Sequence, residues 1–288
     1  MCTERLDEGR FGGVRFGGTL FKQGTELVAL QRDNLEMGNI APQDISKQIP
    51  AWSILTSAYL FRDANHLNAF WSGDLGAQFK KQAESEVKVK ILGPTFFGTR
   101  QVGLKPNKKI NTPADLAGIK LRMPPGDAWQ LLGRSLGANP TPMAYAEVYT
   151  GLQTGAIDGQ DNPLPNVQNM KFYEVMSQIV LTSHLVGYDL LAVNLKAWNA
   201  MGAAKQKAFQ AAADKAIAWS AAEHAKRAAV LDATYIKYRS HPQVAAVFTK
   251  NEVIAAAPPA GQDEQPVVYV SLVVVVAAIS GLIYGSLF

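Results

Sequence analysis

The chain has 288 residues, with 28 lysines and arginines against 24 aspartates and glutamates, 48% hydrophobic residues and one cysteine. This length fits one large domain or two ordinary ones, and the composition is that of a globular protein and excludes wholesale disorder. Cys2 cannot form an internal disulfide, the four histidines have no spacing that pairs two on one helix face, and the basic residues are dispersed. A disulfide scaffold and a thiolate zinc site are therefore excluded, and nucleic acid is not expected as a partner.

The start of the chain is rich in charge. Residues 1–10 contain five charged side chains, whereas a secretory signal needs an apolar run of about 7–15 residues and a small-residue cleavage site. We therefore expect no export signal here. Two glycine pairs follow, at 12–13 and 17–18. They lack the spacing of a phosphate-binding loop and predict a strand flanked by turns.

Helix and strand patterns alternate along the next part of the chain. Helices are expected over residues 24–35 and 66–83, and strands over 37–41 and 87–92. The second strand is expected to end at Gly93-Pro94. This alternation predicts an α/β fold in which helices cover a sheet. The same alternation returns over residues 119–143 and 147–157.

Residues 203–240 predict one long helix. They are rich in Ala, Lys, Glu and Gln and contain no Gly or Pro. At 1.5 Å per residue such a helix reaches about 57 Å, which is longer than a single domain of about 100–150 residues requires. A helix of this length can span two lobes. The alternative is two helices with a break near Ser220.

The end of the chain is a 22-residue run without charge, residues 267–288. As a helix it would span about 33 Å, roughly the thickness of a bilayer's hydrocarbon core. We therefore expect a candidate transmembrane helix that anchors the chain, with residues 241–266 as a linker. The alternative is a buried pair of strands, because the run is rich in valine and has glycines at 281 and 285 that could form turns.

Polar residues with binding chemistry gather in the middle of the chain. Arg122 lies between Leu121 and Met123 in a predicted strand, so its guanidinium must face a polar cleft or a partner carboxylate on the other side. Arginine is the side chain best suited to a bidentate grip on a carboxylate. Asp158-Gly159 predicts a turn, after which the polar run 160–162 can point into a crevice. These are binding groups rather than a catalytic set.

Several segments occur in the order typical of one protein family. The chain resembles the solute receptors of tripartite ATP-independent periplasmic (TRAP) transporters, the C4-dicarboxylate-type binding proteins. The resemblance covers about residues 16–235. Its segments are AYLF (58–61), GTR (98–100), LRMP (121–124), LGANPTPMAYAEVYTGLQTGAIDGQDNP (136–163), KFYEV (171–175) and TSH (182–184).

The resemblance implies an α/β, two-lobed periplasmic-binding-protein-like fold with a hinge and one long helix crossing both lobes. Lobe one is expected to comprise residues 1–100, completed by a return strand and part of the long helix from about 188–240. Lobe two is expected over 101–187. The family's first βα unit is expected to be missing from lobe one, because only about 15 residues precede Phe16.

The resemblance also assigns roles to individual residues near the junction of the lobes and in lobe two. Arg122 takes the position of the family's carboxylate clamp. Arg100 supplies a second donor to the ligand, or alternatively a salt bridge that stabilises a lobe. Asn162 hydrogen-bonds the ligand acid, and Tyr145 packs on the ligand or, alternatively, in the core.

Selectivity is expected to come from lobe one, where Gln43 and Asp44 follow the strand predicted over 37–41. Asp44 could accept hydrogen bonds from ligand hydroxyls or repel a second carboxylate, and both readings stay open. Glu147 is expected to serve the architecture at the start of a helix rather than to contact the ligand.

The resemblance implies a periplasmic, non-enzymatic receptor that captures a small carboxylate ligand and delivers it to the membrane subunits of a TRAP transporter, without metal or cofactor. An enzyme is disfavoured, because no Ser-His-Asp spacing, metal cluster or nucleophile elbow is found and His184 stands alone. The alternative function is an inactive truncated or fused receptor fragment without ligand affinity.

Overall fold

A computed structural model of the chain describes residues 19–239, 247 and 248. In these residues one mixed sheet forms the centre, with strand order β1-β6-β2-β5-β3-β4 and β7 paired to β6. Strand β3 runs parallel to β4 and β5, and the other pairs are antiparallel. The strands are β1 (Met37–Ile40), β2 (Val89–Leu104), β3 (Lys120–Met123), β4 (Asn139–Pro142), β5 (Gly159–Pro163), β6 (Gln178–Asn194) and β7 (Val247–Phe248).

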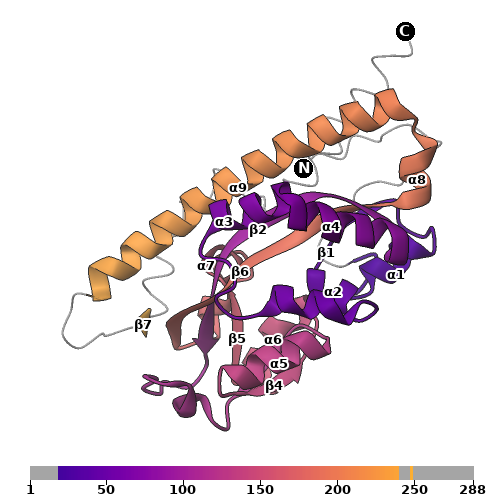
Figure 1. The fold of residues 1–288 in the computed structure, drawn as a ribbon. Coiled ribbons are helices and arrows are strands. Elements are labelled where there is room, and N and C mark those ends of the chain that lie inside the picture. Colours follow the sequence, from indigo (N-terminus) through magenta and orange to yellow (C-terminus); the bar gives the residue numbers. More distant parts are fainter. Residues whose placement is uncertain (1–18, 240–246, 249–288) are drawn as a thin grey trace.

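Helices cover the sheet, as the alternating sequence pattern predicts (Figure 1). The α-helices are α1 (Glu26–Gln31), α2 (Pro42–Ser46), α3 (Ala64–Ser72), α4 (Asp74–Gln82), α5 (Asp127–Ser135), α6 (Val148–Thr154), α7 (Leu164–Asn169), α8 (Leu195–Ala200) and α9 (Ala203–Arg239). Short helices of other types are η1 (Pro50–Thr56), η2 (Ala83–Val87), η3 (Pro113–Leu116), η4 (Tyr145–Glu147) and η5 (Phe172–Glu174).

The two longest strands, β2 and β6, pair with each other over most of their length. Their register shifts at three places, between Ile91 and Gly93, between Phe96 and Gly98, and between Arg100 and Val102. The predicted end of a strand at Gly93-Pro94 is therefore wrong. A bulge inserts an extra residue and bends the strand, so the ladder continues past a glycine and a proline that would interrupt a regular strand.

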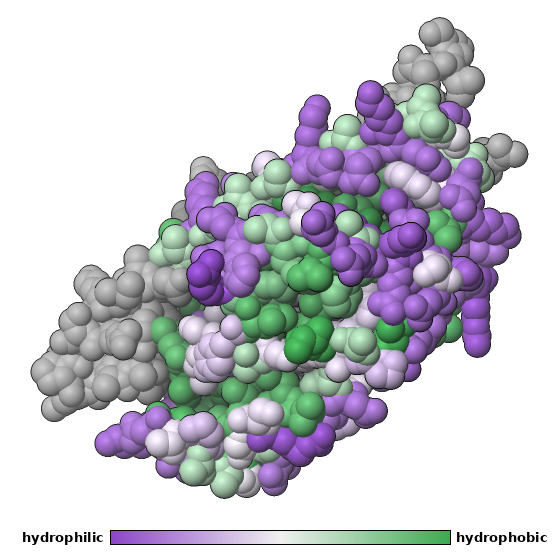
Figure 2. Space-filling model, viewed as in Figure 1, coloured by the Kyte–Doolittle hydropathy of each residue, from purple (hydrophilic) through white to green (hydrophobic). Residues whose placement is uncertain are grey.

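Apolar side chains form separate cores along these long strands. One core takes its buried residues from positions 27–96 and 186–192, and two others take theirs from positions 102–185. On the face shown in Figure 2, hydrophilic residues cover much of the rim and apolar residues gather in the middle. This division of cores supports the proposal of two lobes that meet near residue 100 and are joined by β2 and β6.

Helix α9 is continuous from Ala203 to Arg239, which confirms the predicted long helix and excludes a break near Ser220. Figure 1 shows α9 running along one side of the molecule, and it contacts both β2 and α7. Phe209 and Ala213 pack into a fourth core with Leu92 of β2. One helix thus lies against elements on both sides of the proposed hinge.

Two helix predictions need correction. The helix expected over 66–83 is two helices, α3 and α4, separated by Gly73 in an extended conformation. A Cβ on Gly76 would clash with the carbonyl oxygen of Phe70, so the tight turn between the helices requires a glycine there. Helix α1 ends at Gln31 rather than Leu35, because Asp33 adopts a left-handed conformation (φ 61°) that stops the helix.

The predictions for the glycine pairs and the apolar run 267–288 lie outside the described residues. So does the linker predicted over 241–266, apart from residues 247 and 248, which form β7 and pair with β6. Within the described part of the chain, no helix combines the length and the low polarity needed to cross a membrane.

Candidate functional site

Arg122 lies on the central sheet and is almost fully buried, with 1% of its surface exposed. Its Nε donates to the carbonyl oxygen of Met143 at 2.8 Å, and its Nη2 donates to Oε1 of Gln23 at 2.7 Å. The ring of Tyr145 lies 6.0 Å from the guanidinium carbon. Burial lowers the pKa of Arg122 to about 10, which leaves the group charged at neutral pH.

The neighbours of Arg122 in β3 explain its direction. Leu121 and Met123 are fully buried in one of the cores, so the alternation of a strand turns Arg122 to the opposite face. Among the described residues, no carboxylate lies within 4.0 Å of this guanidinium. The structure thus surrounds a buried cation with neutral acceptors, an arrangement that is costly unless an anion completes it.

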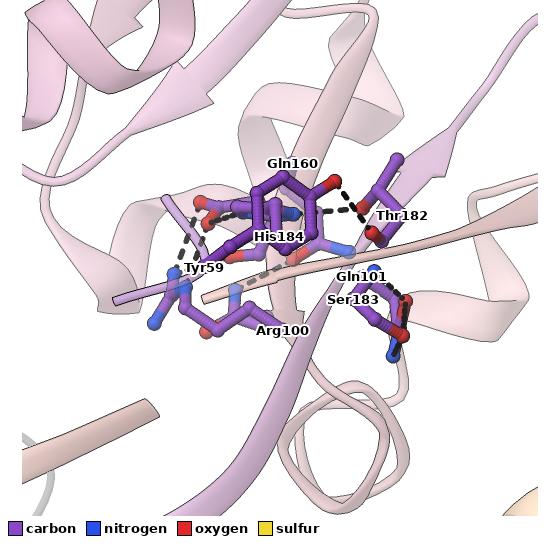
Figure 3. A network of polar contacts seen from close by, with 9 residues as sticks. Tyr59, Arg100, Gln101, Gln160, Thr182, Ser183 and His184 are labelled. Carbon is purple, nitrogen blue, oxygen red and sulfur yellow. Dashed lines mark hydrogen bonds and ion pairs between the residues drawn. The ribbon is translucent and has the colours of Figure 1, made fainter. Parts of the chain in front are cut away.

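Arg100 is also buried, but unlike Arg122 it is paired with a carboxylate. Its Nε donates to Oδ2 of Asp161 at 2.6 Å and its Nη2 donates to Oδ1 at 3.0 Å, which is a bidentate ion pair (Figure 3). The ring of Trp129 lies 4.9 Å from the guanidinium carbon. The salt bridge left open by the sequence is therefore present, and a contact of Arg100 with a ligand stays a prediction.

Asp161 connects Arg100 to a chain of polar groups that ends at the exposed Tyr59. Figure 3 shows Arg100, His184, Thr182 and Tyr59 of this chain close together. Nε2 of His184 lies 3.2 Å from Oδ2 of Asp161, and Nδ1 of His184 lies 2.7 Å from Oγ1 of Thr182. The Tyr59 hydroxyl donates to the carbonyl oxygen of Thr182 at 3.0 Å. Burial alone would raise the pKa of the Asp161 carboxyl, but the charge of Arg100 and the hydrogen bonds of Arg100 and His184 outweigh it and hold that pKa well below its usual range.

Asn162 lies on the same face of the sheet as Arg122. Gln160 in β5 is the register partner of Arg122, and Asn162 follows two residues later along the strand. The Asn162 side-chain amide donates to Oε1 of Gln160 at 2.5 Å. The structure therefore brings Asn162 to the face of the predicted clamp, and its contact with a ligand stays a prediction.

Tyr145 follows β4 and lies beside the clamp. Its backbone N–H donates to Oε1 of Gln23 at 2.8 Å, while its half-buried ring packs edge-on against Phe172 with ring centres 5.9 Å apart. The hydroxyl lies 3.4 Å from the carbonyl oxygen of Asn166. One side of Tyr145 thus belongs to a core and the other adjoins Arg122, so its packing on a ligand remains a prediction.

Gln43 and Asp44 lie on the short helix α2 and are 4% and 5% exposed. Oδ1 of Asp44 accepts from Nζ of Lys47 at 2.7 Å. In the described part of the chain, Oε1 of Gln43 is buried without a hydrogen-bond partner. Burial raises the pKa of Asp44 despite the opposing effect of Lys47.

Two further carboxylates accompany Asp44. Oε2 of Glu26 accepts from the backbone N–H of Gly24 at 2.6 Å, and a Cβ on Gly24 would lie 3.4 Å from Oδ1 of Asp44. Burial, followed by the negative charges of Asp44 and Glu26, raises the pKa of the Asp189 carboxyl in β6 to about 7. We call Glu26, Asp44 and Asp189 the acidic wall.

The acidic wall adjoins the clamp through the segment before α1. Gln23 contacts Arg122 directly, and its neighbour Lys22 forms a 2.7 Å ion pair with Glu147. Lys22 and Gln23 could not be found from the sequence, because polar residues in a loop are ordinary and the partners of both lie about a hundred positions or more away. Glu147 is the N-cap residue of α6, at the helix start that the sequence predicts, and the absence of a ligand contact stays a prediction.

The described residues offer no arrangement for a metal ion. No group of three or more His, Cys, Asp or Glu side chains among them is placed to share one. The chemistry of the site is therefore that of a buried cation, convergent N–H donors and nearby carboxylates, which suits the binding of an anion that also carries hydrogen-bond donors.

Comparisons with known proteins agree with this arrangement. The family model of DctP, bacterial extracellular solute-binding protein, family 7, matches residues 14–256. The solved structure of a TRAP periplasmic solute-binding protein from Roseobacter denitrificans, with bound 3-deoxy-D-manno-oct-2-ulosonic acid, is 36% identical. It superposes with a TM-score of 0.74 over 88% of this chain and 86% of that chain.

Two curated relatives match a smaller share of their own length. The sialic acid-binding periplasmic protein SiaP of Vibrio cholerae is 32% identical over 58% of this chain and 51% of that protein. A second solute-binding protein of Roseobacter denitrificans is 30% identical over 72% of this chain and 63% of that protein. The chain therefore spans between half and two thirds of these relatives.

Proposed function

The chain belongs to family 7 of the bacterial extracellular solute-binding proteins, the DctP family, and from this premise we propose that it is a receptor for a small organic acid anion. The observation that carries the proposal is Arg122, a buried guanidinium that meets only neutral acceptors among the described residues. A ligand carboxylate supplies the missing negative charge.

The other groups around Arg122 complete a binding site rather than a catalytic one. Asn162 shares its sheet face and offers an amide, and Tyr145 offers a backbone N–H and an aromatic ring. Arg100 acts mainly by holding Asp161 and β5 in place, with a direct ligand contact as a further role. None of these groups pairs a nucleophile with a base.

The acidic wall restricts which organic acids we expect to bind. A second ligand carboxylate near Glu26, Asp44 and Asp189 would face like charges in a desolvated site, whereas hydroxyl groups would donate hydrogen bonds to them. We therefore propose a hydroxylated monocarboxylate, a sugar acid, rather than a C4-dicarboxylate. The similar structure from Roseobacter denitrificans carries a ligand of this class.

The proposed partner is the membrane part of a TRAP transporter, and the proposed site of action is the periplasm. In this proposal two lobes close on the ligand. Lobe one comprises residues 1–100 together with the return from about 188–240, and lobe two comprises residues 101–187. The family membership supports an extracytoplasmic role, and two of the similar proteins named above, SiaP and the protein of known structure from Roseobacter denitrificans, are periplasmic binding proteins.

The test is a panel of acids measured by isothermal titration calorimetry on the full chain. We expect 3-deoxy-D-manno-oct-2-ulosonic acid, D-glucuronate or D-galacturonate to bind more tightly than succinate or malate. Arg122→Ala should weaken binding by roughly 10- to 150-fold, since a charge-assisted contact is worth about 1.5–3 kcal/mol. Arg134→Ala, on the exposed side of α5, is the matched control. Binding of no acid, or equal affinity for parent and Arg122→Ala, would contradict the proposal.

A further inference from the structure

Gln23 places a carboxamide oxygen where two donors of the clamp converge. Oε1 accepts from Nη2 of Arg122 at 2.7 Å and from the backbone N–H of Tyr145 at 2.8 Å. Guanidinium and backbone N–H groups that converge on one point are the donor set expected for a carboxylate oxygen. A primary amide has nearly the same shape as a carboxylate, with one oxygen acceptor and no net charge.

The position of Gln23 in the fold makes this contact a bridge between lobes. The residue lies just before α1, in the part of the chain that packs with lobe one, whereas Arg122 and Tyr145 belong to lobe two. Its neighbours hold the segment on both sides. Lys22 pairs with Glu147 of lobe two, and the carbonyl oxygen of Gly24 accepts from Nζ of Lys47 at 3.2 Å.

We infer that Gln23 is a built-in stand-in for the ligand. The carboxamide of Gln23 occupies the position of the ligand carboxylate at Arg122 and must leave when a ligand acid binds. The inference rests on the proposed function and adds an affinity-setting residue to it. An amide satisfies the hydrogen-bond donors of Arg122 without neutralising its charge, so an external carboxylate can displace it.

The Gln23 stand-in lowers the affinity of every ligand that has to displace it. Every ligand has to replace two hydrogen bonds that the free protein already makes, so only the difference between carboxylate and amide contributes to affinity. A carboxylate gains the full charge-assisted contact, whereas a neutral hydroxyl or amide compound gains almost nothing over Gln23. The same contact therefore favours acids over their neutral analogues.

Two substitutions at Gln23 separate a stand-in from an ordinary ligand contact. Gln23→Ala removes the competitor and should tighten binding of D-glucuronate by roughly 2- to 10-fold, the range expected for a net hydrogen bond. Gln23→Glu tethers a carboxylate at the same place and should weaken binding by at least about tenfold, because a tethered group acts at millimolar effective concentration. Gln48→Ala is the matched control, since Gln48 is exposed and bonds Gln31 within lobe one.

The experiment is isothermal titration calorimetry of the full chain and the three variants with D-glucuronate and 3-deoxy-D-manno-oct-2-ulosonic acid. Opposite changes in Gln23→Ala and Gln23→Glu, with Gln48→Ala unchanged, support the stand-in. Weaker or unchanged binding by Gln23→Ala overturns it while the parent's affinity upholds the proposed function. Failure of both the parent and Gln23→Ala to bind any acid overturns the proposed function itself and the stand-in with it.

Discussion

Arg100 and Arg122 lie in one sheet and are both buried, yet their charges are met in opposite ways. Arg100 makes a bidentate ion pair with Asp161, which also contacts His184. Arg122 meets a backbone carbonyl oxygen and a carboxamide, and no carboxylate among the described residues pairs with it. The charge of Arg100 is therefore neutralised within the fold, whereas we propose that the charge of Arg122 is neutralised by a ligand.

The comparison shows that residue type and burial do not decide the role of a charged group. Both arginines are more than nine tenths buried. The difference lies in what the neighbouring strand presents, because Asp161 and Asn162 are adjacent in β5 and point to opposite faces of the sheet. A buried ion pair is expensive to break, whereas a buried cation without an anion is expensive to keep.

The largest expected difference between the two regions is in stability. Arg100→Met leaves Asp161 without its bidentate partner and should lower the free energy of unfolding by about 3–5 kcal/mol. Arg122→Met removes a buried cation that makes no ion pair among the described residues and should change that free energy by less than about 1 kcal/mol. Urea unfolding followed by circular dichroism measures both. Equal losses of unfolding free energy in Arg100→Met and Arg122→Met would contradict the different roles assigned to the two arginines.

The same ion pair predicts how stability depends on pH. The pKa of Asp161 is lower in the folded state than the unfolded value of about 4. Its stabilisation is therefore fully present above about pH 4 and is lost as the pH falls towards the folded-state pKa. Asp161→Asn should be less stable than the parent at neutral pH, and the gap should narrow below about pH 4. A gap that stays constant between pH 7 and pH 2.5 would show that ionisation of Asp161 is not the cause.

A conservative change at Arg122 tests whether its planar shape matters as well as its charge. Arg122→Lys keeps the positive charge but loses the fork that makes two parallel hydrogen bonds, so the affinity for D-glucuronate should fall by about tenfold, or about 1.4 kcal/mol. Titration calorimetry measures the loss, with Arg134→Lys as control. Parent-like affinity would mean that Arg122 acts as a point charge only.

The smallest expected effect concerns the acidic wall. Asp44→Asn removes one negative charge and should shift the ratio of affinities for succinate and D-glucuronate about fivefold towards succinate, since one like-charge contact at partial screening costs about 1 kcal/mol. Competition binding of the two acids to the parent, Asp44→Asn and the exposed control Asp74→Asn measures the ratio. An unchanged ratio would remove Asp44 from the selectivity of the site.

Features that depend on local pattern could be predicted from the sequence. The helix α9 follows from 37 residues without Gly or Pro, and β1 follows from a short apolar run after a helix. The family and the α/β class follow from motifs that keep their order along the chain. The length of β2 and the break at Gly73 could not be predicted, because a bulge and a tight packing of two helices depend on neighbours distant in sequence.

The residues of the candidate site also separate into those that could be predicted from the sequence and those that only the structure reveals. The sequence by itself determined that Arg122 is a clamp candidate with apolar neighbours, because a strand's alternation is local. Only the tertiary structure decided the partners of the two arginines. Asp161 lies 61 positions from Arg100, and Gln23 lies 99 positions from Arg122. The physical reason is that these contacts depend on the register between strands and on the approach of the two lobes, which no periodicity within one segment encodes.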